Sequence, residues 1–130
     1  MRDLERIFKG LADPTRLRIL NLLLHGELCV CDLQYVLRVS QPNISRHLTY
    51  LKASALVRDR REGARIYYRL AQPGAGAHKP LFAFLRELFR TSPALSGDSR
   101  RLKKAMATGS CTVSEWHPYA ALKERASARA

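Results

Sequence analysis

The chain has 130 residues, with 23 lysines and arginines against 11 acidic residues and a formal net charge of +12. This length suits one domain, and the excess positive charge indicates a polyanionic partner, either nucleic acid or an anionic membrane surface. No apolar segment approaches the ~20 residues of a transmembrane helix, and the N-terminus lacks the apolar core of a signal peptide. We therefore expect a cytoplasmic protein with no membrane partner.

Two helices are expected before residue 25. Apolar residues recur at the helical spacing i, i+3, i+4, i+7 in the first, which ends near Ala12. Asp13 and Pro14 then form a helix start, with the aspartate as N-cap and the proline in the first turn. Residues 15–24 are apolar nearly all round, which predicts the central buried helix, and His25 and Gly26 end it.

The next two helices are expected to form a helix-turn-helix. A short helix over residues 28–37 is followed by a turn at residues 38–40 and by a helix that Ser40 or Gln41 caps. The inner stripe of this second helix consists of Ile44, Leu48 and Leu51. Two helices joined by so short a turn, the second opening with small polar residues, are typical of a DNA reader.

Beyond residue 55 the pattern changes to that of strands. Residues 56–60 and 65–70 are expected to pair as a basic hairpin with Gly63 at its tip, which beside a helix-turn-helix is a wing. Residues 72–79 are expected to form a loop and residues 80–89 a helix with a wide apolar face. Pro93 and Gly97 predict a break over residues 91–98, before a short helix at residues 100–107.

The chain contains three cysteines, and two of them lie close together directly upstream of the predicted reader. An odd number in a cytosolic chain argues against a disulfide scaffold, and thiolate pairs select soft ions. Cys29 and Cys31 would point ~200° apart on a regular helix, so one ion could hold both only if the first turn unwinds. This distortion is the expected route from ion binding to weaker DNA binding.

The chain resembles the ArsR/SmtB family of bacterial winged-helix metalloregulators, and within it the arsenic-responsive repressors. The matching segments are residues 11–20, 27–33 and 40–48 and the wing around Gly63, within residues 3–90. The resemblance implies a homodimer built on the first helix and the helix at 80–90. It also implies repression of an operator that includes the protein's own promoter. As(III) or Sb(III) is then the inducer, and no cofactor is permanently bound.

The resemblance further implies that trivalent arsenic takes three thiolates. The arsenic repressors usually carry a third thiol three positions after the second cysteine, where this chain has Gln34. We therefore expect the metal ligands to be Cys29, Cys31 and Cys111, the last from either protomer. The alternative is that two thiols alone bind arsenite. A zinc site would need four nitrogen or sulfur ligands, for which His117 is the plausible fourth.

DNA contacts are expected from the start of the reader helix and from the wing. Residues 38–69 hold eight basic and two acidic side chains, half of the total net charge. The expected contacts are Ser40, Gln41, Asn43, Ser45, Arg46, His47, Arg60, Arg61 and Arg65. His47 falls nearer the buried side of the helix, so it is expected with equal weight to be a hydrogen-bonded strut or phosphate contact, or to read bases.

The expected fold is therefore α+β and mainly α, a winged helix-turn-helix with a β-hairpin wing and dimerising terminal helices. Residues 1–92 are expected to form the dimerising domain and residues 93–130 a basic, partly ordered extension that carries Cys111. The winged-helix part has no glycine-rich phosphate loop, nucleophile elbow or paired carboxylates, so no enzyme is expected. Alternatives left open are a sensor of zinc, cadmium or lead, a DNA architectural protein, and a thiol redox regulator. The redox regulator ranks lower because a disulfide between residues two apart is strained.

Overall fold

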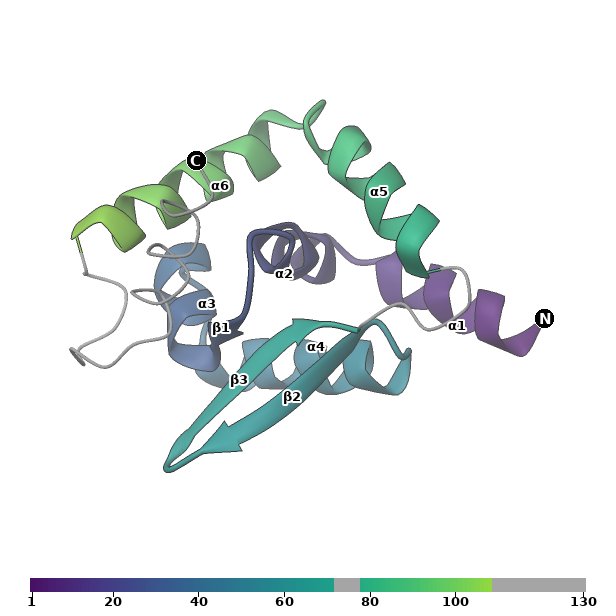
Figure 1. The fold of residues 1–130 in the computed structure, drawn as a ribbon, viewed down its shortest axis with the longest axis horizontal. Helices are drawn as coiled ribbons and strands as arrows, with labels where there is room; N and C mark the ends of the chain where they lie inside the picture. The colour runs from purple at the N-terminus through teal and green to yellow at the C-terminus, as the bar shows by residue number, and fades with distance from the viewer. Residues whose placement is uncertain (72–77, 109–130) are drawn as a thin grey trace.

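The fold is built around one buried helix. The computed structural model describes residues 1–71 and 78–108. Their elements are α1 (Arg2–Leu11), α2 (Pro14–Leu23), β1 (Leu28–Cys29), α3 (Val30–Leu37), α4 (Gln41–Ala53), β2 (Val57–Glu62), β3 (Arg65–Leu70), α5 (His78–Phe89) and α6 (Pro93–Thr108). In Figure 1, α5 and α6 lie on one side of α2, and α4 and the β2–β3 hairpin lie on the other. The predicted winged helix-turn-helix is confirmed.

Helix α2 begins and is buried as its sequence predicts. The Asp13 carboxylate accepts a hydrogen bond from the Arg16 backbone amide at 3.0 Å, and Pro14 occupies the first helical position. The four apolar residues Ile19, Leu20, Leu22 and Leu23 are each at most 3% exposed. The second half of α2 therefore has no side that faces solvent, and the other elements pack around it.

The helix-turn-helix is also confirmed. Helix α3 ends at Leu37, and its C-cap residue Arg38 has a left-handed backbone (φ 56°) that reverses the chain toward α4. Ser40 is the N-cap residue of α4, although its side chain makes no capping hydrogen bond. The inner stripe of Ile44, Leu48 and Leu51 is fully buried, which fixes the opposite side of α4 toward solvent.

Strand β1 was not expected. The sequence predicted a helix from residue 28, but Leu28 pairs with Tyr68 and Cys29 pairs with Tyr67 in an antiparallel ladder. The sheet has the strand order β1-β3-β2, so the wing strand β3 lies between its hairpin partner and the segment that carries Cys29. The predicted hairpin is present, with a tight turn in which Gly63 has a φ of 61°.

The expected break over residues 91–98 is wrong beyond residue 92. Helix α6 starts at Pro93, because proline suits a first helical position, and continues through Gly97. Its residues Leu95, Leu102 and Ala105 belong to the same hydrophobic core as α2. This burial outweighs the ~1 kcal/mol that one glycine costs inside a helix. The described part of the expected extension thus packs on the helix-turn-helix.

Two further expectations concern segments outside the described residues. They are the greater part of the loop predicted at 72–79, and Cys111 with the rest of the chain from residue 109. Among the described residues, none of the helices has the length and apolar character needed to cross a bilayer.

The junction between α2 and α6 contains a histidine that carries a testable pH dependence. His25 Nε2 lies 3.1 Å from the Ser99 hydroxyl. Burial, followed by the positive charges of Lys103 and Arg86, lowers the pKa of His25 below its ordinary 6.5. The unfolded chain therefore binds a proton here at a higher pH than the folded chain does.

We expect wild type to lose unfolding free energy relative to His25→Gln as the pH falls from about 6.5 toward the lowered folded pKa. Above that window the difference between the two proteins should be constant, because His25 is neutral in both states. Urea denaturation at about pH 8 and about pH 5.5 measures this pH-dependent part. Equal acid sensitivity of the two proteins would contradict it.

Candidate nucleic-acid interface and thiol site

The first turns of α4 present polar side chains to solvent. Ser40, Gln41, Asn43 and Arg46 are exposed, and Ser45 is half-buried. Gln41 Nε2 donates to the Ser45 hydroxyl at 3.3 Å, and Arg46 donates to the Asn43 side-chain oxygen at 2.9 Å. Four of the predicted DNA contacts therefore form two side-chain pairs in the first two turns of α4, and Ser40 precedes them at the N-cap. Their hydrogen bonds to each other are exposed and can be exchanged for bonds to a ligand.

His47, by contrast, lies at the junction between α4 and α2. Its Nδ1 is 3.7 Å from the Asp13 carboxylate and 3.3 Å from an Arg16 guanidinium nitrogen, and its side chain is 15% exposed. Arg16 also donates to the carbonyl oxygens of Lys9 and Gly10 at the end of α1. These contacts favour a strut that fixes the angle of α4.

The three predicted wing arginines have different surroundings. Arg61 is exposed next to the Gly63 turn, and Arg65 is half-buried. Arg60 has partners within the protein, since its guanidinium lies 2.6 Å from Glu27 and 2.5 Å from Glu62. These two carboxylates, Glu27 foremost, raise the pKa of Arg60. Of the three, Arg61 is thus the most available to a phosphate.

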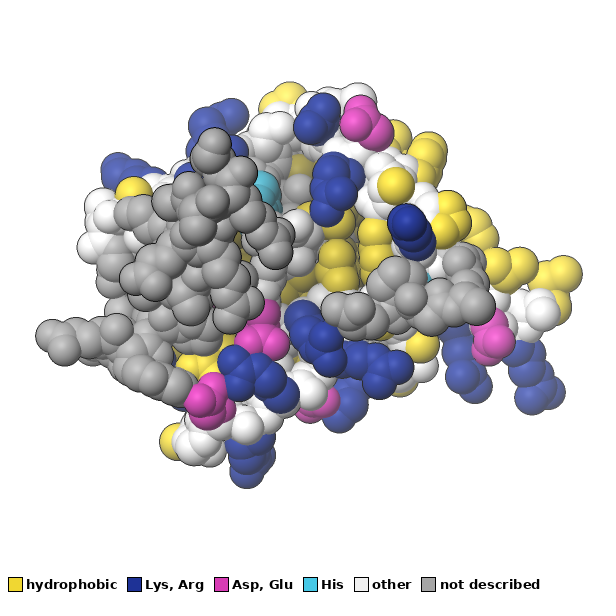
Figure 2. Space-filling model, viewed as in Figure 1, with side chains coloured by type: hydrophobic (Ala, Val, Ile, Leu, Met, Phe, Trp, Pro, Cys, Tyr) yellow, Lys and Arg dark blue, Asp and Glu magenta, His cyan; other side chains and the backbone are white. Residues whose placement is uncertain are grey.

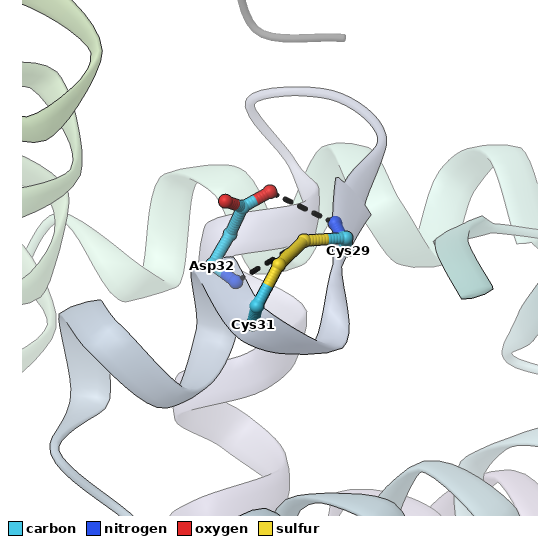
Figure 3. A group of neighbouring side chains, drawn as sticks. All are labelled: Cys29, Cys31 and Asp32. Carbon is cyan, nitrogen blue, oxygen red and sulfur yellow. Dashed lines mark hydrogen bonds between the residues drawn. A yellow bond between two sulfur atoms is a disulfide. The ribbon is translucent and has the colours of Figure 1, made fainter. Parts of the chain in front are cut away.

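The thiol site lies where β1 meets α3 (Figure 3). Cys29 is 1% exposed, whereas Cys31 is exposed, and the two are joined as a disulfide with their Cα atoms 5.3 Å apart. The ligand atoms of Cys29, Cys31 and Asp32 all lie within 4.8 Å of one another. The two sulfurs therefore converge at one point that solvent reaches through Cys31.

One expectation about this site is wrong. Cys29 is not on the helix but is its N-cap, with extended backbone (φ −85°, ψ 163°), so both sulfurs meet without unwinding of α3. The extended N-cap conformation turns the Cys29 side chain toward Cys31, which a regular helix would not do.

Asp32 was missed by the sequence reasoning. The Cys29 sulfur accepts the Asp32 backbone N–H at 3.4 Å, and the Asp32 carboxylate accepts the Cys29 N–H at 2.9 Å. This reciprocal pair is a capping box in which a cysteine sulfur takes the place of the usual hydroxyl oxygen. The signal was present in the sequence as a small polar residue followed three positions later by an acid.

An exposed apolar surface connects the first helix to α5. Its large members are Leu4 (48% exposed), Phe8 (66%), Phe84 (60%) and Leu88 (46%). Figure 2 shows hydrophobic side chains continuing along this side of the molecule from α5 to the start of α1. We call these four residues the α1/α5 face. Large contiguous apolar patches of this kind mark interaction sites.

Comparisons with known proteins match this chain to bacterial regulators that have a winged helix-turn-helix. Residues 13–59 match the bacterial regulatory proteins of the arsR family. The arsenical resistance operon repressor of Escherichia coli is 55% identical over 67 residues, 51% of this chain and 57% of that protein. The chain spans about half the length of the first curated relatives that it matches.

Two solved structures extend the likeness over more of the chain. HlyU from Vibrio cholerae superposes with a TM-score of 0.60 and 32% identity, covering 67% of this chain and 91% of that one. The homodimeric winged helix-turn-helix DNA-binding domain of a possible ArsR-family regulator from Mycobacterium bovis gives a TM-score of 0.60 at 36% identity. It covers 67% of this chain and 78% of that one.

Proposed function

The chain belongs to the ArsR family of bacterial transcriptional regulators, and on this premise we propose that it is a homodimeric repressor with a thiol-based metalloid switch. It binds double-stranded operator DNA through α4 and the wing. It releases the operator when As(III) or Sb(III) binds Cys29 and Cys31, with Cys111 as the third ligand. The observation that carries this proposal is the convergence of the Cys29 and Cys31 sulfurs at the start of α3, the helix that leads into the reader helix.

DNA binding is supported by the exposed side of α4. Side chains at the N-terminal end of a recognition helix reach base edges in the major groove, and this is where Gln41, Asn43 and Arg46 are exposed. Ser40 and Ser45 are assigned to the same groove, Arg61 and Arg65 to phosphates, and His47 to holding α4 in place. Arg60 reaches DNA only if it leaves Glu27.

Dimerisation is supported by the α1/α5 face. Apolar side chains of this size are poorly solvated in water. The composition of this face therefore points to a surface that a partner covers. The M. bovis neighbour is a homodimer. Two reader helices related by a two-fold axis bind two half-sites about one helical turn apart.

The donor set of the thiol site suits a soft ion. Each As–S bond forms as a hydroxyl of arsenous acid leaves as water with the thiol proton, and arsenic stays trivalent. The disulfide must therefore be reduced before the ion binds. Asp32 is a hard oxygen donor and is already used in the capping box, so we assign it to holding Cys29 rather than to the ion.

A second candidate function rests on the disulfide itself. If Cys29 and Cys31 exchange between dithiol and disulfide, the same site senses oxidants. The two functions differ in their response to a reductant. A metalloid sensor releases DNA with arsenite in the presence of a phosphine reductant, whereas a redox sensor releases DNA on oxidation and rebinds it when the reductant is added.

The deciding experiment titrates arsenite into the reduced protein on labelled operator DNA, with wild type, Cys29→Ser, Cys31→Ser and Cys111→Ser. Serine is a good N-cap residue, so Cys29→Ser keeps the start of α3. We expect Cys29→Ser and Cys31→Ser to bind DNA as wild type does and to remain bound when arsenite is added. Cys111→Ser should need more arsenite for release. If Cys29→Ser responds like wild type the thiol switch is wrong, and if Cys111→Ser does so the third ligand is wrong.

The wing carries its own prediction. Replacing Arg61 with alanine removes one phosphate contact, and each such contact contributes ~0.9 to the slope of log affinity against log salt concentration. We expect the slope to fall by about this amount in Arg61→Ala. The matched control is Arg100→Ala, which removes another exposed charge from α6, on the other side of α2 from α4. An unchanged slope in Arg61→Ala would remove the tip of the wing from the interface.

A further inference from the structure

One row of residues crosses the three-stranded sheet from the thiol site to the wing. Cys29 of β1 lies opposite Tyr67 of β3, and Tyr67 lies opposite Arg60 of β2. Residues directly opposite in antiparallel strands place their side chains on the same face of the sheet. Tyr67 is fully buried, and the Arg60 guanidinium lies 4.6 Å from the centre of its ring. A single tyrosine thus separates a candidate metalloid ligand from a wing arginine.

Glu27 closes this row with an ion pair. It precedes Cys29 by two residues, and its carboxylate oxygen lies 2.8 Å from Arg60 Nε and 2.6 Å from a second guanidinium nitrogen. The side chains of Glu27 and Arg60 are 19% and 44% exposed. Pairs this exposed contribute little to stability. The pair nevertheless ties the segment leading into β1 to the middle of β2, across the strand between them.

We propose that Glu27 is a positioning residue that couples the thiol site to the wing, an inference that rests on the proposed function. Cys29 is held by the ladder to β3 on one side and by the capping box to α3 on the other. A displacement of Cys29 by an ion would therefore move both α3, which leads into the reader helix, and β3 of the wing. Glu27 transmits this movement to the wing strand β2, because its ion pair joins the segment before Cys29 directly to Arg60.

Coupling of this kind is reciprocal and has a measurable size. A ligand that weakens DNA binding by some factor is itself bound more weakly by that factor when DNA is present. Removing the Glu27 bridge leaves the thiols and the reader helix in place but cuts one of the two connections. We expect Glu27→Gln to reduce the arsenite-induced loss of operator affinity by at least about fivefold, within the range typical of such couplings.

The chain offers a closely matched control for this variant. Glu62 also pairs with Arg60, at 2.5 Å, but it belongs to β2 and so is part of the wing itself. Glu62→Gln removes the same charge from the same guanidinium without touching the Cys29 segment. We expect it to keep the full arsenite response.

The experiment compares wild type, Glu27→Gln and Glu62→Gln as reduced full-length proteins. Arsenite binding without DNA is followed by the near-ultraviolet absorbance of arsenic–thiolate bonds, and operator affinity with and without saturating arsenite by fluorescence anisotropy. Support requires that Glu27→Gln binds arsenite as wild type does, and that its arsenite-induced loss of operator affinity is at least about fivefold smaller than in wild type. Glu62→Gln must match wild type in both measurements.

Three results would overturn the inference. A wild-type response in Glu27→Gln removes its role in coupling, and an equal loss of response in Glu62→Gln assigns the effect to wing charge. Failure of Glu27→Gln to bind arsenite makes it part of the thiol site itself. The proposed function fails separately, if wild-type protein does not bind arsenite or does not release the operator.

Discussion

Phe84→Glu is expected to convert the protein to a monomer and to weaken operator binding by at least about 100-fold, because a dimer gains 10²–10⁴ in avidity from its second half-site. Phe84 is 60% exposed on α5, and Phe8, 66% exposed on α1, should behave in the same way. Each glutamate would place a charge inside a desolvated apolar interface. Sedimentation equilibrium measures the oligomeric state, and fluorescence anisotropy measures operator affinity.

The control adds the same charge elsewhere. Ala107 is exposed near the end of α6, on the other side of the molecule from the start of α1. Ala107→Glu should remain dimeric and bind operator within a few-fold of wild type. A dimeric Phe84→Glu protein would show that the α1/α5 face is not the contact between protomers.

Asp98→Ala is expected to lower the free energy of unfolding by about 2–4 kcal/mol, since breaking a buried ion pair leaves uncompensated charge and the pair here is partly open to solvent. Asp98 is 1% exposed, and its two oxygens accept from Arg18 Nε at 2.8 Å and a terminal nitrogen at 3.0 Å. Arg101 donates to the same carboxylate. The ion pair raises the pKa of Arg18 through its hydrogen bond to Asp98.

Urea denaturation measures this effect at fixed protein concentration, so that the proposed dimerisation would contribute equally to all the proteins compared. Glu87→Ala serves as the control. It removes a carboxylate whose pair with Arg90 spans 3.6 Å with both side chains more than 70% exposed, and should cost less than about 1 kcal/mol. Similar losses in the two variants would mean that Asp98 does not tie α6 to α2.

The elements that could be predicted from the sequence are those whose structure is determined by a few neighbouring residues. The start of α2 follows from Asp13 and Pro14, and the side of α4 that faces solvent follows from three apolar residues at helical spacing. Both are short-range patterns whose outcome the rest of the fold does not overrule. The candidate DNA contacts on α4 were located from the same stripe.

The parts that were not predictable depend on distant partners. Leu28 and Cys29 form a strand because Tyr67 and Tyr68, some forty residues away, offer an open edge. Helix α6 continues through a glycine because its apolar residues join the core around α2, a helix far earlier in the chain. Neither of these long-range contacts can be recognised from the residues around the affected segment. The convergence of the two thiols was missed for the same reason, since it follows from β1 and not from the helix.

The close approach at Gly10 has a consequence for which operators the protein accepts. A Cβ atom at this position would lie 2.7 Å from Leu56 Cδ1 and 3.0 Å from the Ser54 hydroxyl, so the last turn of α1 rests directly on the end of α4. In a dimer built on α1, this contact sets the distance from the two-fold axis to each reader helix. Half-sites must be about 34 Å apart to be read together. If the proposed dimer forms, the absence of a side chain at Gly10 would therefore help to set the spacing of the half-sites that it binds.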